Sequence, residues 1–154
     1  MPADTPPSPS AAEGADLRLP NPATSPPQQV MKAALQTYVD CMNRQDVAGL
    51  LALFAADAII EDPVGSPVRH RHELEDWFRA SVALRAQLRM AAPCRGSWAN
   101  EAAMVFEVDY NADRRRLRTR SLDVCTFDAA GRITSLRAFW GPEDVEDLGP
   151  ALYD

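Results

Sequence analysis

The apolar residues of this 154-residue chain change their spacing near residue 84. In three segments between Gln28 and Val82 they recur every three or four positions, which is the spacing of an amphipathic helix. From Leu84 onward they alternate with polar residues, which is the spacing of a half-buried β-strand. The pattern therefore predicts an α+β fold, with N-terminal helices packed on one face of a curved antiparallel or mixed sheet.

Turn and capping residues divide this pattern into expected elements. The expected helices cover residues 28–43, 47–54 and 72–82, and a short first strand is expected at 58–61. The expected later strands are 84–90, 104–110, 117–127 and 133–140. Asp46 stands where it would cap the second helix, and Gly131 closes an expected hairpin turn. A sheet curved around helices forms a cone, whose mouth is a natural ligand cavity.

The chain is expected to hold one domain, from residue 28 to residue 145. A hydrophobic content of 46% is enough to build one core. Residues 1–27 contain eight of the 13 prolines, mixed with Ala, Ser and Thr, and this composition predicts a disordered tail. Residues 146–154 are expected to form a C-terminal tail.

Composition excludes several classes of function. A net charge of −6 argues against a nucleic-acid partner, because such proteins need a basic face to neutralise phosphates. No apolar run approaches the about 20 residues that span a membrane. The three cysteines are widely spaced and lack a C-x-x-C pair, which is typical of buried thiols in a reducing cytoplasm. We therefore expect a cytoplasmic protein.

Three polar residues lie within apolar segments. Tyr38 falls on the apolar face of the first expected helix, and Asp62 ends an apolar run before the rigid turn at Pro63. Asp123 shares a strand face with Phe127. A buried carboxylate is costly unless it is paired or protonated. Two carboxylates and a phenol directed into one apolar pocket would make proton-transfer chemistry possible.

Each of the three also has an ordinary structural interpretation. Asp62 before Pro63 could simply initiate a turn, and Tyr38 could be a core residue with its hydroxyl at the rim. Asp123 is harder to explain in this way, because an acid among apolar strand residues needs a partner or a proton. Their coincidence favours a site with one ionised carboxylate that acts as a base and one neutral carboxyl that donates a hydrogen bond.

These residues carry a resemblance to a known family. With the segments Glu61-Asp62-Pro63-Val64-Gly65 and Gly131-Arg132-Ile133, the chain resembles the bacterial steroid Δ5-isomerases (ketosteroid isomerases) of the NTF2-like, or SnoaL-like, superfamily. The resemblance covers residues 30 to 143. The two segments are shared across the superfamily, whereas Tyr38, Asp62 and Asp123 together match the isomerases.

The resemblance implies a role for each residue. Asp62 would be the general base, and Tyr38 and Asp123 would donate hydrogen bonds to a dienolate oxygen. The implied substrate is an apolar, steroid-like ketone, and the implied pocket wall consists of Met104, Phe106, Val108, Ala138 and Trp140. The family works without a metal or an organic cofactor, so none is expected. Its usual state is a homodimer, for which the outer sheet face with Leu122, Val124 and Phe139 offers apolar surface.

The chain departs from that family at two places. Phe54 and Phe78 stand where better-known members have tyrosines that hydrogen-bond to the oxyanion tyrosine, so Tyr38 would lose supporting donors. His70 or Arg71 falls near a position that is usually small. Two other functions stay open: an epoxide hydrolase or cyclase-type enzyme of polyketide or related metabolism, and a non-catalytic protein of the same fold that binds a small molecule.

Overall fold

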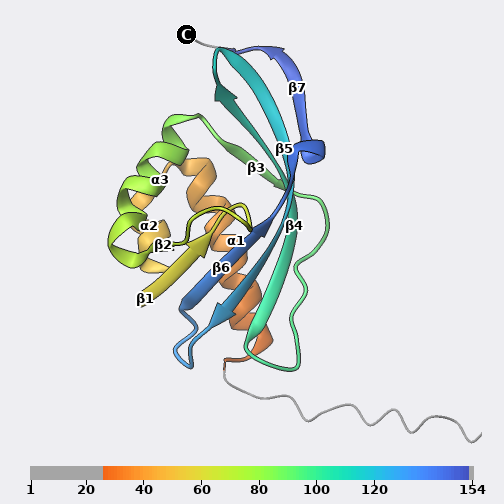
Figure 1. Ribbon diagram of the computed structural model, residues 1–154. Coiled ribbons are helices and arrows are strands. Elements are labelled where there is room, and N and C mark those ends of the chain that lie inside the picture. Colours follow the sequence, from red (N-terminus) through yellow and green to blue (C-terminus); the bar gives the residue numbers. More distant parts are fainter. Residues whose placement is uncertain (1–25, 153–154) are drawn as a thin grey trace, which may run out of the picture.

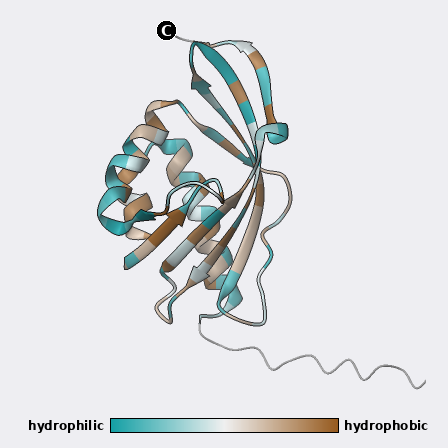
Figure 2. Ribbon diagram, in the orientation of Figure 1, coloured by the Kyte–Doolittle hydropathy of each residue, from teal (hydrophilic) through white to brown (hydrophobic). Residues whose placement is uncertain are grey.

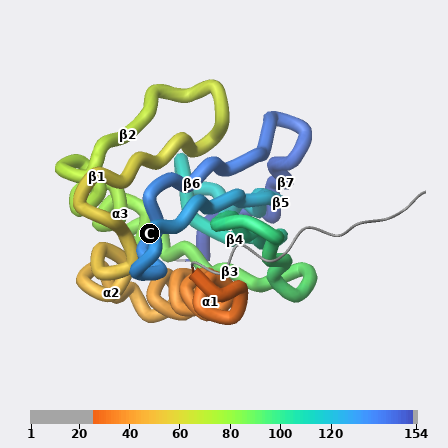
Figure 3. Tube along the Cα trace, turned by 90° about the horizontal axis from the view of Figure 1, so that it is seen from below, coloured from red at the N-terminus to blue at the C-terminus, as the bar shows by residue number. Residues whose placement is uncertain are grey.

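The computed structural model describes residues 26–152, and the proline-rich segment expected to be disordered lies almost wholly outside that range. Helices cover one face of a curved seven-stranded sheet, as Figure 1 shows. Seen from below, α1 lies alongside β3 and β4 (Figure 3). The prediction of an α+β fold with a mixed sheet is confirmed.

The sheet has a single parallel pair. The helices are α1 (Gln28–Arg44), α2 (Val47–Ala52), the 3-10 turn η1 (Arg71–Glu73), α3 (Leu74–Ala83) and the 3-10 turn η2 (Pro142–Asp144). The strands are β1 (Phe54–Glu61), β2 (Arg69–His70), β3 (Gln87–Met90), β4 (Glu101–Ala112), β5 (Arg115–Phe127), β6 (Ile133–Phe139) and β7 (Val145–Pro150). The strand order is β2-β1-β6-β5-β4-β3, with β7 also paired to β5. Among these described strands, β1 and β6 alone run parallel.

The second helix is shorter and the first strand longer than the sequence predicts. Asp46 caps α2 as expected, since its side chain accepts a hydrogen bond from the N–H of Gly49 (2.8 Å). The helix ends at Ala52, and β1 already begins at Phe54, which pairs with Ile133 of β6. The residues after Ala52 have helical composition, but pairing with a strand distant in the sequence determines their conformation.

The expected C-terminal tail is wrong in part. Residues 145–150 form β7, which pairs antiparallel with Arg115–Thr119 in the first half of β5. Its apolar and polar residues alternate only weakly, and all six of its residues are half-buried or exposed. The strand is therefore stabilised by its ladder with β5 and by ion pairs such as Arg115 with Asp147 (2.9 Å), which local sequence does not reveal.

Strands β4 and β5 divide the molecule into an inner and an outer face. Asp123, Ser121 and Thr119 point inward and are buried, whereas Leu122 points outward. In Figure 2, β1 is largely brown and the outward side of α3 is largely teal. The parity predicted for Asp123 is therefore observed, and β5 presents a row of polar groups to the helices.

The cysteines are unpaired, and the described helices do not suit a membrane. Cys41, Cys94 and Cys125 are free thiols. Within residues 26–152, the helices are all too short or too polar to cross a membrane.

Asn43 joins the end of α1 to the edge strand β3, so its replacement tests this junction. Its Nδ2 donates to the carbonyl of Leu88 (3.0 Å), and the N–H of Leu88 donates to its Oδ1 (2.7 Å). Asn43→Ala removes both bonds and should lower the free energy of unfolding by about 1–2 kcal/mol in urea denaturation. Gln36→Ala is the matched control, because it removes an exposed hydrogen bond of the same helix. Equal losses in the two variants would contradict the assignment.

Candidate active site

A cavity of about 240 Å³ lies between the helices and the inner face of the sheet. Helices α1 and α3 supply one wall, β3, β4 and β5 supply the other, and the ends of β1 and β6 close it. Its lining residues are Tyr38, Met42, Asp62, Trp77, Ser81, Leu84, Ala86, Leu88, Phe106, Val108, Tyr110, Thr119, Ser121, Asp123 and Trp140. The structure thus brings Tyr38, Asp62 and Asp123 together from three distant segments.

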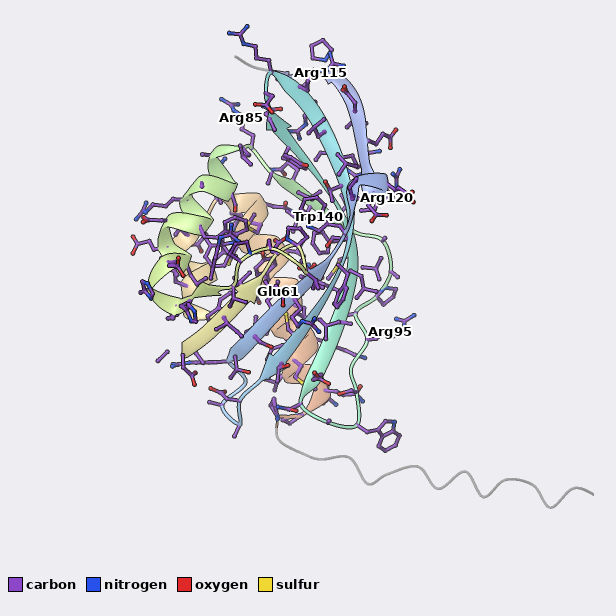
Figure 4. All side chains as sticks on the ribbon, in the orientation of Figure 1. Glu61, Arg85, Arg95, Arg115, Arg120 and Trp140 are labelled. Atoms are coloured by element: carbon purple, nitrogen blue, oxygen red, sulfur yellow. The ribbon has the colours of Figure 1, made fainter. Side chains whose placement is uncertain are left out.

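Asp62 follows directly on β1 and accepts a hydrogen bond from the indole Nε1 of Trp140 (2.8 Å). Figure 4 shows Trp140 between the helices and the sheet. Burial raises the pKa of Asp62 above its ordinary value, while the Trp140 bond and the positive charge of Arg69 oppose that rise. A carboxylate in this environment is a stronger base than one in water, and the Trp140 bond stabilises its ionised form.

Asp123 lies in the middle of β5 with a side chain that is 2% exposed. Burial, and then the negative charge of Asp62, hold its pKa well above the ordinary value, although a hydrogen bond from Ser121 acts in the opposite direction. That bond joins Ser121 Oγ to Asp123 Oδ1 (2.8 Å). Because Oδ1 already accepts the hydrogen bond from Ser121, Oδ2 is left to carry the carboxyl proton and to donate a hydrogen bond to a ligand.

Tyr38 is buried on α1 and packs edge-on against Phe54 and Phe78, with ring centroids 6.5 and 6.2 Å away. Burial raises its pKa well above the ordinary value, and the charges of Asp123 and Asp62 raise it further, so the phenol stays protonated. No residue in the described part of the chain forms a hydrogen bond with its hydroxyl. Its O–H is therefore available to a ligand oxygen.

The three groups form a complementary set. One carboxylate has an indole donor and a nearby positive charge that favour its ionised form, while a second carboxyl and a phenol are neutral donors in an apolar surrounding. A base next to two donors can remove a proton from a carbon beside a carbonyl group and stabilise the oxyanion that results. The low dielectric of the cavity strengthens both effects.

The pocket wall differs in part from the expectation. Phe106, Val108 and Trp140 line the cavity. Met104 and Ala138 instead belong to the hydrophobic core and flank Asp123 as its two neighbours across the sheet. They supply the apolar surroundings of the carboxyl rather than a surface for a ligand.

Several groups of the site were not predicted. The helices and β3 contribute apolar lining such as Met42, Leu84 and Leu88, which sequence patterns do not distinguish from ordinary core. The Trp140 bond to Asp62 had one available signal, since a buried indole N–H usually has a partner. Arg69 stacks on Trp77, with its guanidinium carbon 3.7 Å from the ring centroid. His70 and Arg71 do not line the cavity.

Within residues 26–152, no group of three or more His, Cys, Asp or Glu side chains is arranged so that it could hold a metal ion.

The fold and the site define the class of protein. The chain belongs to the SnoaL-like family, whose domain model matches residues 35–136. Among curated proteins it is similar to the steroid Delta-isomerase of Nocardioides simplex, with 38% identity over 116 residues that cover 75% of this chain and 93% of that enzyme.

Two further relatives have a different chemistry. The epoxide hydrolase LasB of Streptomyces lasalocidi is 32% identical over 127 residues, which cover 77% of this chain and 44% of that enzyme. Among solved structures, the chain is similar to SalBIII, an epoxide hydrolase/cyclase-like enzyme of pyran ring formation in the polyether salinomycin. The TM-score is 0.73 at 26% identity, and the match covers 81% of this chain and 98% of that one.

The hydrogen bond from Trp140 should be measurable in the titration of Asp62. Trp140→Phe removes the bond that lowers the pKa of Asp62, so the carboxyl should titrate at higher pH than in the wild type. NMR titration of the side-chain carboxyl carbon measures this directly. Trp98→Phe, at an exposed indole outside the cavity, is the matched control. An unchanged or lower pKa in Trp140→Phe would contradict the described bond.

Proposed function

We propose that this protein is a steroid Δ5-isomerase, which moves a carbon–carbon double bond of a ketosteroid into conjugation with its ketone. The observation that carries the proposal is the placement of Asp62 in one apolar cavity with two neutral donors, Tyr38 and Asp123. The 38% identity with a steroid Delta-isomerase over most of both chains supports it.

The proposed reaction is an intramolecular proton transfer. Asp62 takes a proton from the carbon between the ketone and the double bond, and the electron pair of that C–H bond passes into a dienolate. Tyr38 and Asp123 donate hydrogen bonds to the ketone oxygen as its negative charge develops. The protonated Asp62 then returns the proton to the far carbon of the dienolate, which restores the base and leaves a conjugated enone.

A second candidate is an epoxide hydrolase or cyclase of polyketide or related metabolism. The similarity to LasB and SalBIII favours it. Asp62 could activate water or a hydroxyl group, and Asp123 could protonate the epoxide oxygen as its C–O bond breaks. The isomerase is preferred because Tyr38 offers a second O–H beside Asp123, which suits a carbonyl oxygen that gains a full charge.

Replacement of the base tests the mechanism. Asp62→Asn should lower the rate of conjugated-enone formation from a Δ5-3-ketosteroid by about 10³-fold or more, because an amide cannot accept the proton. Enone absorbance measures the rate. The binding of a phenolic steroid, which presents its oxygen to Tyr38 and Asp123, should be nearly unchanged. Asp57→Asn, an exposed position on β1, serves as the control.

The outcomes separate the candidate functions. Wild-type turnover in Asp62→Asn would exclude Asp62 as the base. Absence of turnover in the wild type, with tight binding of the phenolic steroid, would exclude the isomerase reaction, and epoxide substrates would then be assayed. Ligand binding with no turnover of either substrate class would favour a non-catalytic binding protein.

The proposal includes a homodimer formed through the outer face of the sheet. Val105, Leu122 and Phe139 are neighbours on three adjacent strands and point outward. Their exposed fractions are 41%, 39% and 43%. These residues form an apolar row on the face opposite the cavity, and such surfaces are typical of subunit contacts. A two-fold contact would place the row of one subunit against the same row of another.

A single charge placed in this row should break the dimer. Leu122→Lys should change the molar mass in solution from that of a dimer to that of a monomer, as measured by light scattering after size exclusion. Leu148→Lys is the matched control, because Leu148 is also 39% exposed but lies on β7, outside the row. A monomeric wild type, or a monomer in both variants, would refute the assigned interface.

A further inference from the structure

A second polar group lies in the same cavity, away from the three residues discussed above. The hydroxyl of Tyr110 on β4 and the hydroxyl of Thr119 on β5 are 3.0 Å apart and share a hydrogen bond. Both residues line the cavity, and Thr119 is only 2% exposed. Tyr110 is half-buried, and withdrawing two hydroxyls from water costs free energy that their mutual bond offsets only in part.

The hydrogen-bond inventory of the pair leaves one donor free. Two hydroxyls carry two protons, and the bond between them uses one, whichever atom donates. Neither side-chain oxygen has another hydrogen-bond partner in residues 26–152. The two serine hydroxyls that line the cavity are engaged: Ser81 donates to the carbonyl of Trp77 (2.9 Å), and Ser121 donates to Asp123. The pair therefore retains one O–H and several lone pairs for a ligand.

The position of the pair relative to Asp123 is set by one strand. Thr119 and Asp123 are four residues apart on β5, on the same face, so their side chains emerge about 13 Å from one another. Apolar residues occupy the space on the neighbouring strands, including Phe106 and Val108. Between Thr119 and Asp123 on β5 lies Ser121, whose hydroxyl proton is donated to Asp123, so the cavity presents available donors at two ends and a mainly apolar wall between them.

We propose that the Tyr110–Thr119 pair binds a second oxygen atom of the substrate, at the end of the molecule remote from the reacting ketone. This inference rests on the proposed isomerase function and assigns to it two residues that select among its substrates. The pair favours a fused-ring ketone with a keto or hydroxyl group on its far ring over one without that oxygen. A keto oxygen accepts the free O–H, and a hydroxyl group can either donate to the pair or accept from it.

The test compares two Δ5-3-ketosteroids that differ only in a keto group on the far ring. The wild type should have a kcat/KM about fivefold higher for the steroid that carries this oxygen, which corresponds to one hydrogen bond between neutral groups. The binding of the corresponding pair of phenolic steroids, measured by calorimetry, should show the same ratio in Kd. In Tyr110→Phe/Thr119→Val both ratios should fall to about one.

The double substitution is needed because each single variant leaves one hydroxyl that can still donate. Thr134→Val is the matched control: its hydroxyl donates to the carbonyl of Thr126 (3.1 Å) outside the cavity, so the ratios should stay at the wild-type value. The wild-type comparison involves no substitution and tests the inference even if the double variant does not fold.

The possible results distinguish the two proposals. Turnover of both steroids with equal kcat/KM in the wild type, or a preference that persists in a folded double variant, would overturn the distal site and leave the isomerase function standing. Absence of turnover and of phenolic-steroid binding would overturn both. A preference in the wild type that disappears in the double variant and remains in Thr134→Val would establish the site.

Discussion

The burial of the Asp123 carboxyl within β5 is the constraint on which the rest of the site depends. A carboxylate at this position would lack water, so the group is stable as the neutral acid, and it can then act as a donor. The fold supports that state from both sides of the strand, where Met104 and Ala138 are apolar neighbours, and this burial outweighs the hydrogen bond from Ser121, which by itself favours the ionised form. Asp62 differs from Asp123 in that it accepts a hydrogen bond from Trp140 and lies near the positive charge of Arg69, and both favour its ionised form.

Much of this arrangement could be predicted from the sequence, because it follows from strand parity. The alternation that places Asp123 inward with Phe127 needs no tertiary information, and the spacing of the first helix likewise turns Tyr38 toward the core. Other features depend on partners remote in the chain. The early start of β1, the existence of β7 and the bond from Trp140 to Asp62 each require a strand pairing or contact that local composition does not encode.

The aromatic surroundings of Tyr38 distinguish this site from one with a network of tyrosines. Phe54 and Phe78 fix the position of the ring through edge contacts but supply no donor to its oxygen. The phenol is therefore less acidic than one that accepts hydrogen bonds, and a weaker donor toward an oxyanion. Asp123, supported by Ser121, then carries a larger share of the stabilisation, which makes β5 the principal element of the site.

A single continuous strand holds both polar ends of the cavity, and this has a consequence for how ligand preference can change. The distance between the ends is a multiple of the two-residue repeat of an extended chain, about 7 Å per step, and the ladders with β4, β6 and β7 prevent stretching. In the proposed binding mode, moving the remote hydroxyl from Thr119 to another inward position of β5 would alter the accepted ligand length in discrete increments. The backbone of β5 fixes the spacing of these increments. A point substitution changes only which inward position carries the hydroxyl.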